Sequence, residues 1–170
     1  VGEDRETVQL DTFGAGVTPR GLDMSGFGGS FNPTVNIQGS ISGANDTEGR
    51  IRFSSVGGSV TVAGAVTLGD GSQCIAVNGS TGTYAFNGGG TLDGCSTQAI
   101  NINDGTADID FAGTWSLTNA DYGIRTNTAG GSLTMPATTT ISNAAFAAID
   151  LLQTHGAGIQ IDYAGSIDQS

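Results

Sequence analysis

The sequence predicts an all-β solenoid, in which similar turns of chain, called rungs, stack along one axis; three observations lead to this fold class. First, apolar residues recur with a period of 24 to 26 residues along almost the whole 170-residue chain. Second, the apolar residues of each repeat come in pairs two positions apart, the spacing of side chains on one face of a strand. Third, the chain is rich in Ile, Val, Thr, Ser and Asn and poor in the good helix formers Leu, Met, Glu and Lys.

Each rung is expected to hold three short strands, and about six rungs fill the chain. The first strand is predicted at Val35/Ile37, Val60/Val62, Tyr84/Phe86, Ile109/Phe111, Leu133/Met135 and Ile159/Ile161. The second is predicted at Ile41, Val66/Leu68, Leu92, Trp115/Leu117, Ile141 and Ile167. The third is predicted at Ile51/Phe53, Ile75/Val77, Ile100/Ile102, Ile124 and Ile149/Leu151.

The turns between these strands repeat as well. A glycine recurs two residues beyond the first strand, at Gly39, Gly64, Gly88 and Gly113. It indicates either a backbone conformation closed to other residues or a close approach of stacked backbones. One position of the third strand holds asparagine in three rungs, at Asn78, Asn103 and Asn127. Because side-chain amides can hydrogen-bond from rung to rung, we expect a structural Asn ladder there.

The regular rungs are expected to span residues 35–170, and residues 1–34 to form an irregular N-terminal rung or a partial cap. A weak first rung is predicted in this part at Val8/Leu10, Val17 and Phe27. The last rung is incomplete. Since an uncovered solenoid end exposes strand edges, we expect more chain of the same parent, or a second copy, to lie against it.

Cys74 and Cys95 fall 21 residues apart in neighbouring rungs. The rung spacing allows the Cα separation of about 4.4 to 6.8 Å that a disulfide needs, so we predict that Cys74 and Cys95 are bonded, which would indicate an oxidising compartment. Two separate buried thiols are the alternative. Two cysteines are too few for a structural zinc site, and His155 is too distant in the repeat to complete one.

The formal net charge of −11 arises from thirteen Asp and three Glu against five Arg. Such a surface repels phosphate backbones, which disfavours nucleic-acid binding. An acidic composition is typical of proteins that must stay soluble in a secreted or salty setting. Divalent-cation binding is the alternative interpretation. No apolar run is long enough to cross a membrane as a helix. We expect no metal site and no cofactor.

Two stretches carry a resemblance to a known family: GGTLDGCSTQAININDG at residues 89–105 and GSLTMPATTTISNAAFAAIDL at residues 131–151. They are similar to the strand-repeat regions of large secreted bacterial exoproteins and autotransporter-like adhesins. The resemblance covers residues 35–170 and implies a right-handed parallel β-helix outside the cell. It implies little about activity, because pectin-degrading enzymes, phage tailspikes and adhesins share this scaffold.

The best candidates for catalysis are Asp108 and Asp110, which flank the inward-facing Ile109 and should point outward about 7 Å apart. Glycoside hydrolysis needs two carboxyl groups about 5 to 9.5 Å apart. However, the expected neighbours in the adjacent rungs include no arginine: they are Thr83, Ala85, Ser132 and Thr134. A solvated strand face explains the pair equally well, and we expect no catalytic residues.

Two further patterns fall on outward positions. Arg125 and Asp150 occupy equivalent places in adjacent rungs, which predicts a structural ion pair of about 0.2 to 1 kcal/mol. A hydroxyl column precedes the inward residue of the second strand at Ser40, Thr67, Thr91, Ser116, Thr140 and Ser166. Strand propensity and cross-strand contacts explain this column; ice binding and glycan contact are the functional alternatives.

Together these expectations favour a non-catalytic structural segment of a secreted or cell-surface protein, either an adhesin stalk or an extracellular filament subunit. Its partners would be the remainder of a parent chain, identical copies end to end, or cell-surface glycans, with neither nucleic acid nor membrane insertion. The alternatives are a polysaccharide-active β-helix enzyme (a lyase or a glycoside hydrolase) and a glycan-binding module. An enzyme would need long loops around a groove, and a glycan-binding module would expose aromatic rings. Most aromatic residues fall on inward positions; the pattern does not place Tyr122 or Phe146.

Overall fold

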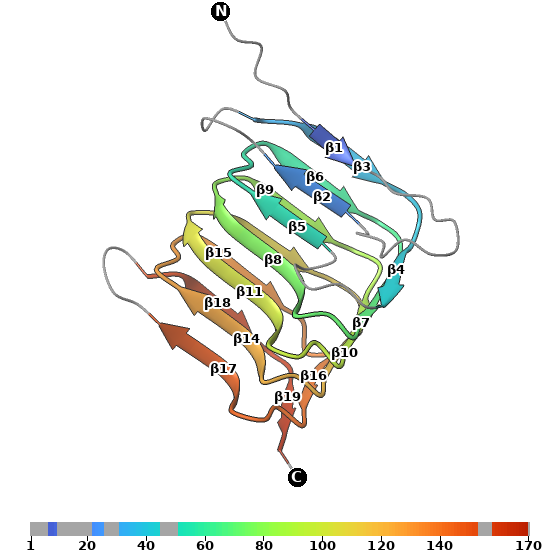
Figure 1. Cartoon of the computed structure of the whole chain (residues 1–170), viewed down its shortest axis with the longest axis vertical. Helices are drawn as coiled ribbons and strands as arrows, with labels where there is room; N and C mark the ends of the chain where they lie inside the picture. The colour runs from blue at the N-terminus through green and yellow to red at the C-terminus, as the bar shows by residue number, and fades with distance from the viewer. Residues whose placement is uncertain (1–6, 10–21, 26–30, 45–50, 153–157, 170) are drawn as a thin grey trace, which may run out of the picture.

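The computed structural model describes residues 7–9, 22–25, 31–44, 51–152 and 158–169, and its architecture is a parallel β-solenoid of about five to six turns (Figure 1). Within these residues there is no helix. The predicted all-β solenoid with three short strands per rung is therefore confirmed.

Corresponding strands of successive rungs form three sheets. The first sheet contains β3 (Thr34–Ile37), β6 (Ser59–Val62), β9 (Thr83–Phe86), β12 (Asp108–Phe111), β15 (Ser132–Met135) and β18 (Gln160–Tyr163). The second contains β4 (Ile41–Ala44), β7 (Val66–Gly69), β10 (Gly90–Asp93), β13 (Trp115–Thr118), β16 (Thr139–Ser142) and β19 (Ser166–Asp168). The third contains β1 (Thr7–Gln9), β2 (Leu22–Ser25), β5 (Ile51–Ser54), β8 (Gln73–Ser80), β11 (Gln98–Gly105), β14 (Tyr122–Asn127) and β17 (Ala147–Leu152).

The inward columns of the three sheets meet in one continuous apolar core. Phe86 and Phe111, which occupy the same inward column one rung apart, have ring centroids 4.8 Å apart and planes 11° from parallel. Trp115 stands nearly perpendicular to Phe111, at 87° and 4.8 Å. Because aromatic pairs in these geometries add about 0.5 to 1.5 kcal/mol to their burial, the stack is a principal contribution to the stability of the middle rungs.

Close backbone approach explains two of the four turn glycines, Gly64 and Gly88. A Cβ atom on Gly64 would collide with the carbonyl oxygen of Gly39 in the preceding rung, and a Cβ on Gly88 would collide with the backbone of Gly64. Since any larger residue would push the rungs apart, close approach of stacked backbones explains Gly64 and Gly88, whereas Gly113 has a left-handed φ of 82° and a Cβ on Gly39 would meet open space.

Two register predictions are wrong. In the last rung Leu133 pairs with Ile161 and Met135 with Tyr163, so the inward pair is Ile161/Tyr163 and not Ile159/Ile161. This rung is longer than the repeat measured elsewhere, and a fixed period therefore places its strand two residues early. In the second sheet Ser42, not Ser40, pairs with Thr67 and begins the hydroxyl column, because Ile41 pairs with Val66.

The predicted N-terminal rung also needs correction. The third-strand pair of this region is Leu22 and Met24, which are fully buried in β2, and not Phe27. Val8 lies in β1, which pairs antiparallel with β2 at the end of the third sheet rather than forming a first strand. The other predicted members of this rung, Leu10, Val17 and Phe27, lie outside the described residues.

Candidate functional site

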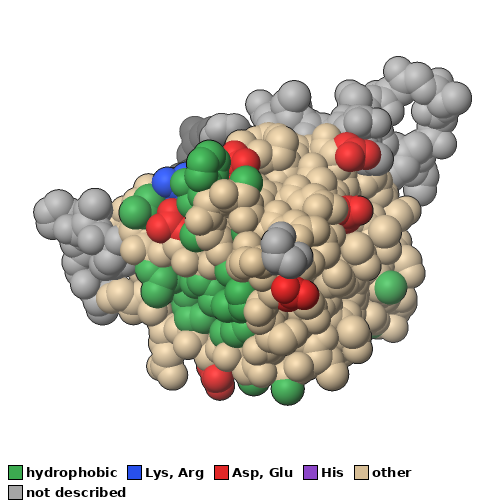
Figure 2. All heavy atoms as spheres, turned by 90° about the horizontal axis from the view of Figure 1, so that it is seen from below, with side chains coloured by type: hydrophobic (Ala, Val, Ile, Leu, Met, Phe, Trp, Pro, Cys, Tyr) green, Lys and Arg blue, Asp and Glu red, His purple; other side chains and the backbone are tan. Residues whose placement is uncertain are grey.

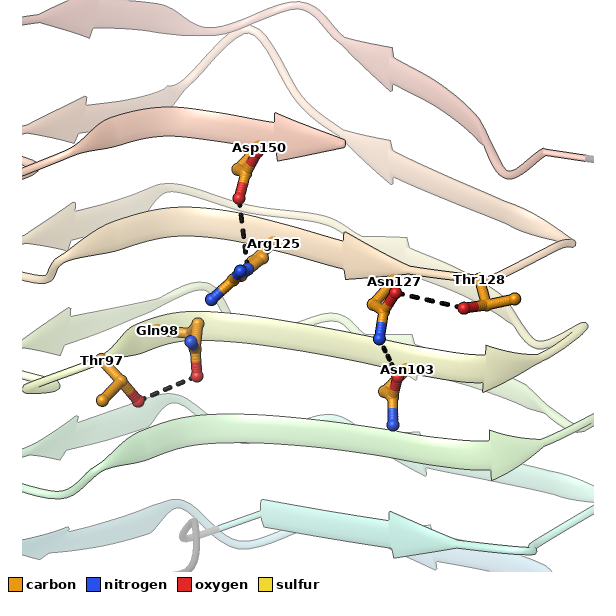
Figure 3. A network of polar contacts seen from close by, with 7 residues as sticks. All are labelled: Thr97, Gln98, Asn103, Arg125, Asn127, Thr128 and Asp150. Carbon is orange, nitrogen blue, oxygen red and sulfur yellow. Dashed lines mark hydrogen bonds and ion pairs between the residues drawn. The ribbon is translucent and has the colours of Figure 1, made fainter. Parts of the chain in front are cut away.

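The Asn ladder lies on the outer face of the third sheet. Asn78, Asn103 and Asn127 occupy equivalent places in β8, β11 and β14. The Asn127 side-chain amide donates to the Oδ1 of Asn103 at 2.9 Å, and Thr128 donates to the Oδ1 of Asn127 at 3.1 Å (Figure 3). The bond from Asn127 to Asn103 joins neighbouring rungs through side chains, whereas the bond from Thr128 lies within one rung.

The same face carries the charged pair Arg125 and Asp150. These residues pair in register between β14 and β17, with the Nε of Arg125 3.2 Å from the Oδ2 of Asp150 (Figure 3). The Arg125 guanidinium also lies 4.5 Å from the ring centroid of Tyr122. Both charged side chains are about 30 % exposed, so the ion pair itself contributes little to stability, and its main effect is to fix the positions of the two groups.

Tyr122 has a second neighbour, the aromatic ring of Phe146, at a centroid distance of 5.6 Å. Phe146 directly precedes β17, and 71 % of its surface is exposed. Strict alternation from the inward Ile124 would place Tyr122 in the core as well. Instead Gly123 faces the core, where a Cβ would lie 2.6 Å from a methyl group of Ile141, and Tyr122 contacts Arg125 on the outside.

Cys74 and Cys95 are joined by a disulfide with a Cα separation of 5.7 Å. Both residues are fully buried beside the apolar core. The bond links β8 to the turn that precedes β11, which are adjacent strands of the third sheet. A stable disulfide fits an oxidising compartment such as the extracellular space.

Asp108 and Asp110 both lie exposed on the outer face of the first sheet. Their neighbours are those expected from the sequence: Thr83 and Ala85 in β9, Ser132 and Thr134 in β15. The Oδ1 of Asp108 accepts a hydrogen bond of 2.7 Å from Ser132. No cation is paired with either carboxylate among the ion pairs of the described residues.

A second polar ladder, which sequence reasoning missed, follows the corner between the second and third sheets. The Oδ1 of Asp93 accepts hydrogen bonds from Thr118 at 2.9 Å and from Asn119 at 2.7 Å, and Asn143 donates to Asn119 at 3.3 Å. Asp70, Asn119 and Asn143 all have left-handed φ values near 54°. Asp and Asn tolerate this conformation better than most residues, and their recurrence at this corner was the available signal.

In the part of the chain that the structure describes, no group of three or more His, Cys, Asp or Glu side chains could hold a metal ion. Asp70 follows β7, Asp93 ends β10 and Asp104 lies near the end of β11, and His155 is outside this part. The described residues likewise contain no helix with the length and apolar character needed to cross a bilayer.

Comparison of the chain with protein-family models, with curated proteins and with solved structures finds no match. What can be said of its function therefore rests on the geometry given above.

Proposed function

We propose that this chain is a structural β-solenoid segment of a secreted or cell-surface protein, of the adhesin-stalk or extracellular-filament kind, with no catalytic site of its own. Its role is mechanical: the stacked rungs form a stiff rod that spans distance and continues through further rungs. The buried disulfide supports an extracellular setting. A net charge of −11 disfavours nucleic acid as a partner.

The observation that carries the proposal is the apolar face of the rung built by β17, β18 and β19. This rung lies at the edge of all three sheets. Its inward side chains continue the core columns but stay partly open: Ile149, Ile161 and Tyr163 are half-buried, while Leu151 and Ile167 are 56 % and 50 % exposed. Figure 2 looks onto this end and shows apolar side chains gathered on it.

A further rung of the same kind fits this face better than any other occupant. Its strands would pair with β17, β18 and β19 in parallel, and its inward side chains would extend the three existing columns. Edge strands left unpaired are templates for such pairing. Head-to-tail addition of copies without a closing rotation would generate an open filament, whereas a longer parent chain would supply the rung within one molecule.

Sedimentation velocity over a concentration series, together with electron microscopy, tests the filament form. We expect the 170-residue chain to associate end to end, and Leu151→Glu to prevent association because it places a charge in the column between two rungs. Thr91→Glu is the matched control, since Thr91 is exposed in the middle of the second sheet, and it should leave association unchanged.

The stalk form is tested on the full product of the natural gene by amide hydrogen exchange. There the amides of β17, β18 and β19 should be protected by neighbouring strands. Two results together would contradict the rod proposal: the 170-residue chain stays monomeric at every concentration, and the full gene product shows no added protection at these strands. Asp108 and Asp110 would then be reopened as candidates for catalysis.

A further inference from the structure

The four residues Tyr122, Arg125, Phe146 and Asp150 form a surface group outside the apolar core; we call it the Phe146 cluster. Each residue contacts the next. The ring centroids of Phe146 and Tyr122 are 5.6 Å apart, the Arg125 guanidinium lies 4.5 Å from the Tyr122 centroid, and the Nε of Arg125 lies 3.2 Å from the Oδ2 of Asp150. Tyr122 and Arg125 belong to β14, Asp150 belongs to β17, and Phe146 precedes β17. The cluster therefore spans two rungs of a rigid sheet.

Phe146 is the most exposed large apolar side chain of the described residues, and like Leu151 and Ile167 it belongs to the end rung. The other phenylalanines in the described part of the chain are at most 5 % exposed, and Tyr84 and Trp115 are at most 1 % exposed. Leaving a phenylalanine ring 71 % exposed forgoes much of the stabilisation that its burial would give. The ring is nevertheless held in place from one side by Tyr122, which Arg125 contacts in turn.

Charge limits the ligands that suit this surface. The chain carries −11 overall, and within the cluster the positive charge of Arg125 is balanced by Asp150 at 3.2 Å. A polyanion would therefore meet no net positive charge here and would be repelled by the molecule as a whole. A neutral ligand needs no net positive charge at the site and is not repelled by the negative charge of the molecule.

The cluster also offers two kinds of contact side by side. The exposed ring presents a π-face of partial negative charge, which attracts weakly positive C–H groups. Arg125 supplies several N–H donors in a fixed fork, and Asp150 supplies acceptor oxygens. Apolar faces combined with a few fixed polar groups are typical of small-molecule binding sites.

We propose that the Phe146 cluster binds a pyranose unit of a neutral, β-linked glycan. In a β-linked glucopyranose-type unit all ring substituents are equatorial, so that axial C–H groups face the Phe146 ring while hydroxyl groups at the rim reach Arg125 and Asp150. The interaction is non-covalent. It adds a recognition function to a segment otherwise proposed as a spacer.

The test is a titration of the ¹⁵N-labelled 170-residue chain with cellohexaose and with chitohexaose, followed by amide chemical shifts. At least one of these saccharides should give saturable shifts confined to β14, β17 and the turn before β17. Phe146→Ala should weaken the affinity about tenfold, which corresponds to about 1.4 kcal/mol. Phe146→Trp keeps a ring and should retain the affinity.

Ile167→Ala is the matched control, because it removes an exposed apolar side chain from β19 and should leave saccharide affinity unchanged. The proposal is overturned if neither saccharide gives saturable shifts, or if Ile167→Ala weakens binding as much as Phe146→Ala. It is also overturned if Phe146→Ala spares saccharide binding but abolishes end-to-end association, since Phe146 would then belong to the contact between rungs.

Discussion

Replacing Thr139 by valine should stabilise the protein. Thr139 begins β16, is 1 % exposed and pairs in register with Trp115 in the core of the second sheet. Its hydroxyl oxygen has no hydrogen-bond partner. Valine has nearly the same shape and places a methyl group where threonine has the hydroxyl, so the substitution removes a buried polar atom without opening a cavity.

The size of the effect follows from that unpaired hydroxyl. A buried polar group without a partner costs about 1 to 3 kcal/mol, and Thr139→Val should raise the free energy of unfolding by about this amount. For a chain of this length each kcal/mol corresponds to about 2 to 4 °C in Tm. Urea denaturation is the appropriate assay, because an unchanged m-value with a raised midpoint shows that stability alone has changed.

Two further variants separate the causes. Thr139→Ser keeps the hydroxyl and loses a buried methyl group, and should destabilise by about 0.8 kcal/mol. Thr140→Val changes the adjacent, half-buried residue of the outer face and should stay within about 0.5 kcal/mol of the parent. If Thr139→Val instead lowered the urea midpoint, the hydroxyl would have to make a favourable contact, and the reasoning from its isolation would be refuted.

Three other predictions concern the core. Phe111→Ala should lower the free energy of unfolding by about 3 to 5 kcal/mol in urea denaturation, whereas the exposed control Thr134→Ala should have little effect; equal losses would contradict the aromatic stack. The intact mass of the unfolded chain should rise by two hydrogens on reduction of Cys74–Cys95, and no rise would mean two free thiols. Burial raises the pKa of Tyr84 in the folded protein above its ordinary 10.0. Between the pKa of the unfolded chain and this higher pKa, the unfolded chain binds fewer protons than the folded protein, so stability should fall as the pH rises above 10. Tyr84→Phe should flatten this alkaline fall, and a fall of unchanged steepness would show that other groups cause it.

The fold was predictable because the apolar residues that repeat along the sequence are the same residues that form the core. Ile75, Ile100 and Ile124 recur at a nearly constant interval, and each is fully buried in adjacent strands. The interval fails where a rung changes length, as between Leu133 and Ile161, because the number of residues in a surface turn is not constrained by the core.

Other features depend on complementary shapes between rungs that no single repeat reveals. Gly90 has no side chain because Trp115 of the next rung fills that space, where a Cβ would lie 2.8 Å from the indole ring. Similarly, Gly123 turns inward against Ile141, and this reversal of the alternation exposes Tyr122. The most informative surface group, the Phe146 cluster, therefore arises where the two-residue period breaks down, and periodicity alone could not place it.

The antiparallel strand β1 makes the two ends of the rod chemically different. At one end β17, β18 and β19 all present edges to which a parallel strand can be added. At the other end the third sheet finishes in β1, whose direction is reversed relative to β2, and only β3 and β4 continue the parallel arrangement of their sheets. An incoming rung would thus find three matching edges at one end and two at the other. A head-to-tail contact between two copies joins one end of each kind, so two of its three strand pairs would be parallel and the pair of β17 with β1 would be antiparallel.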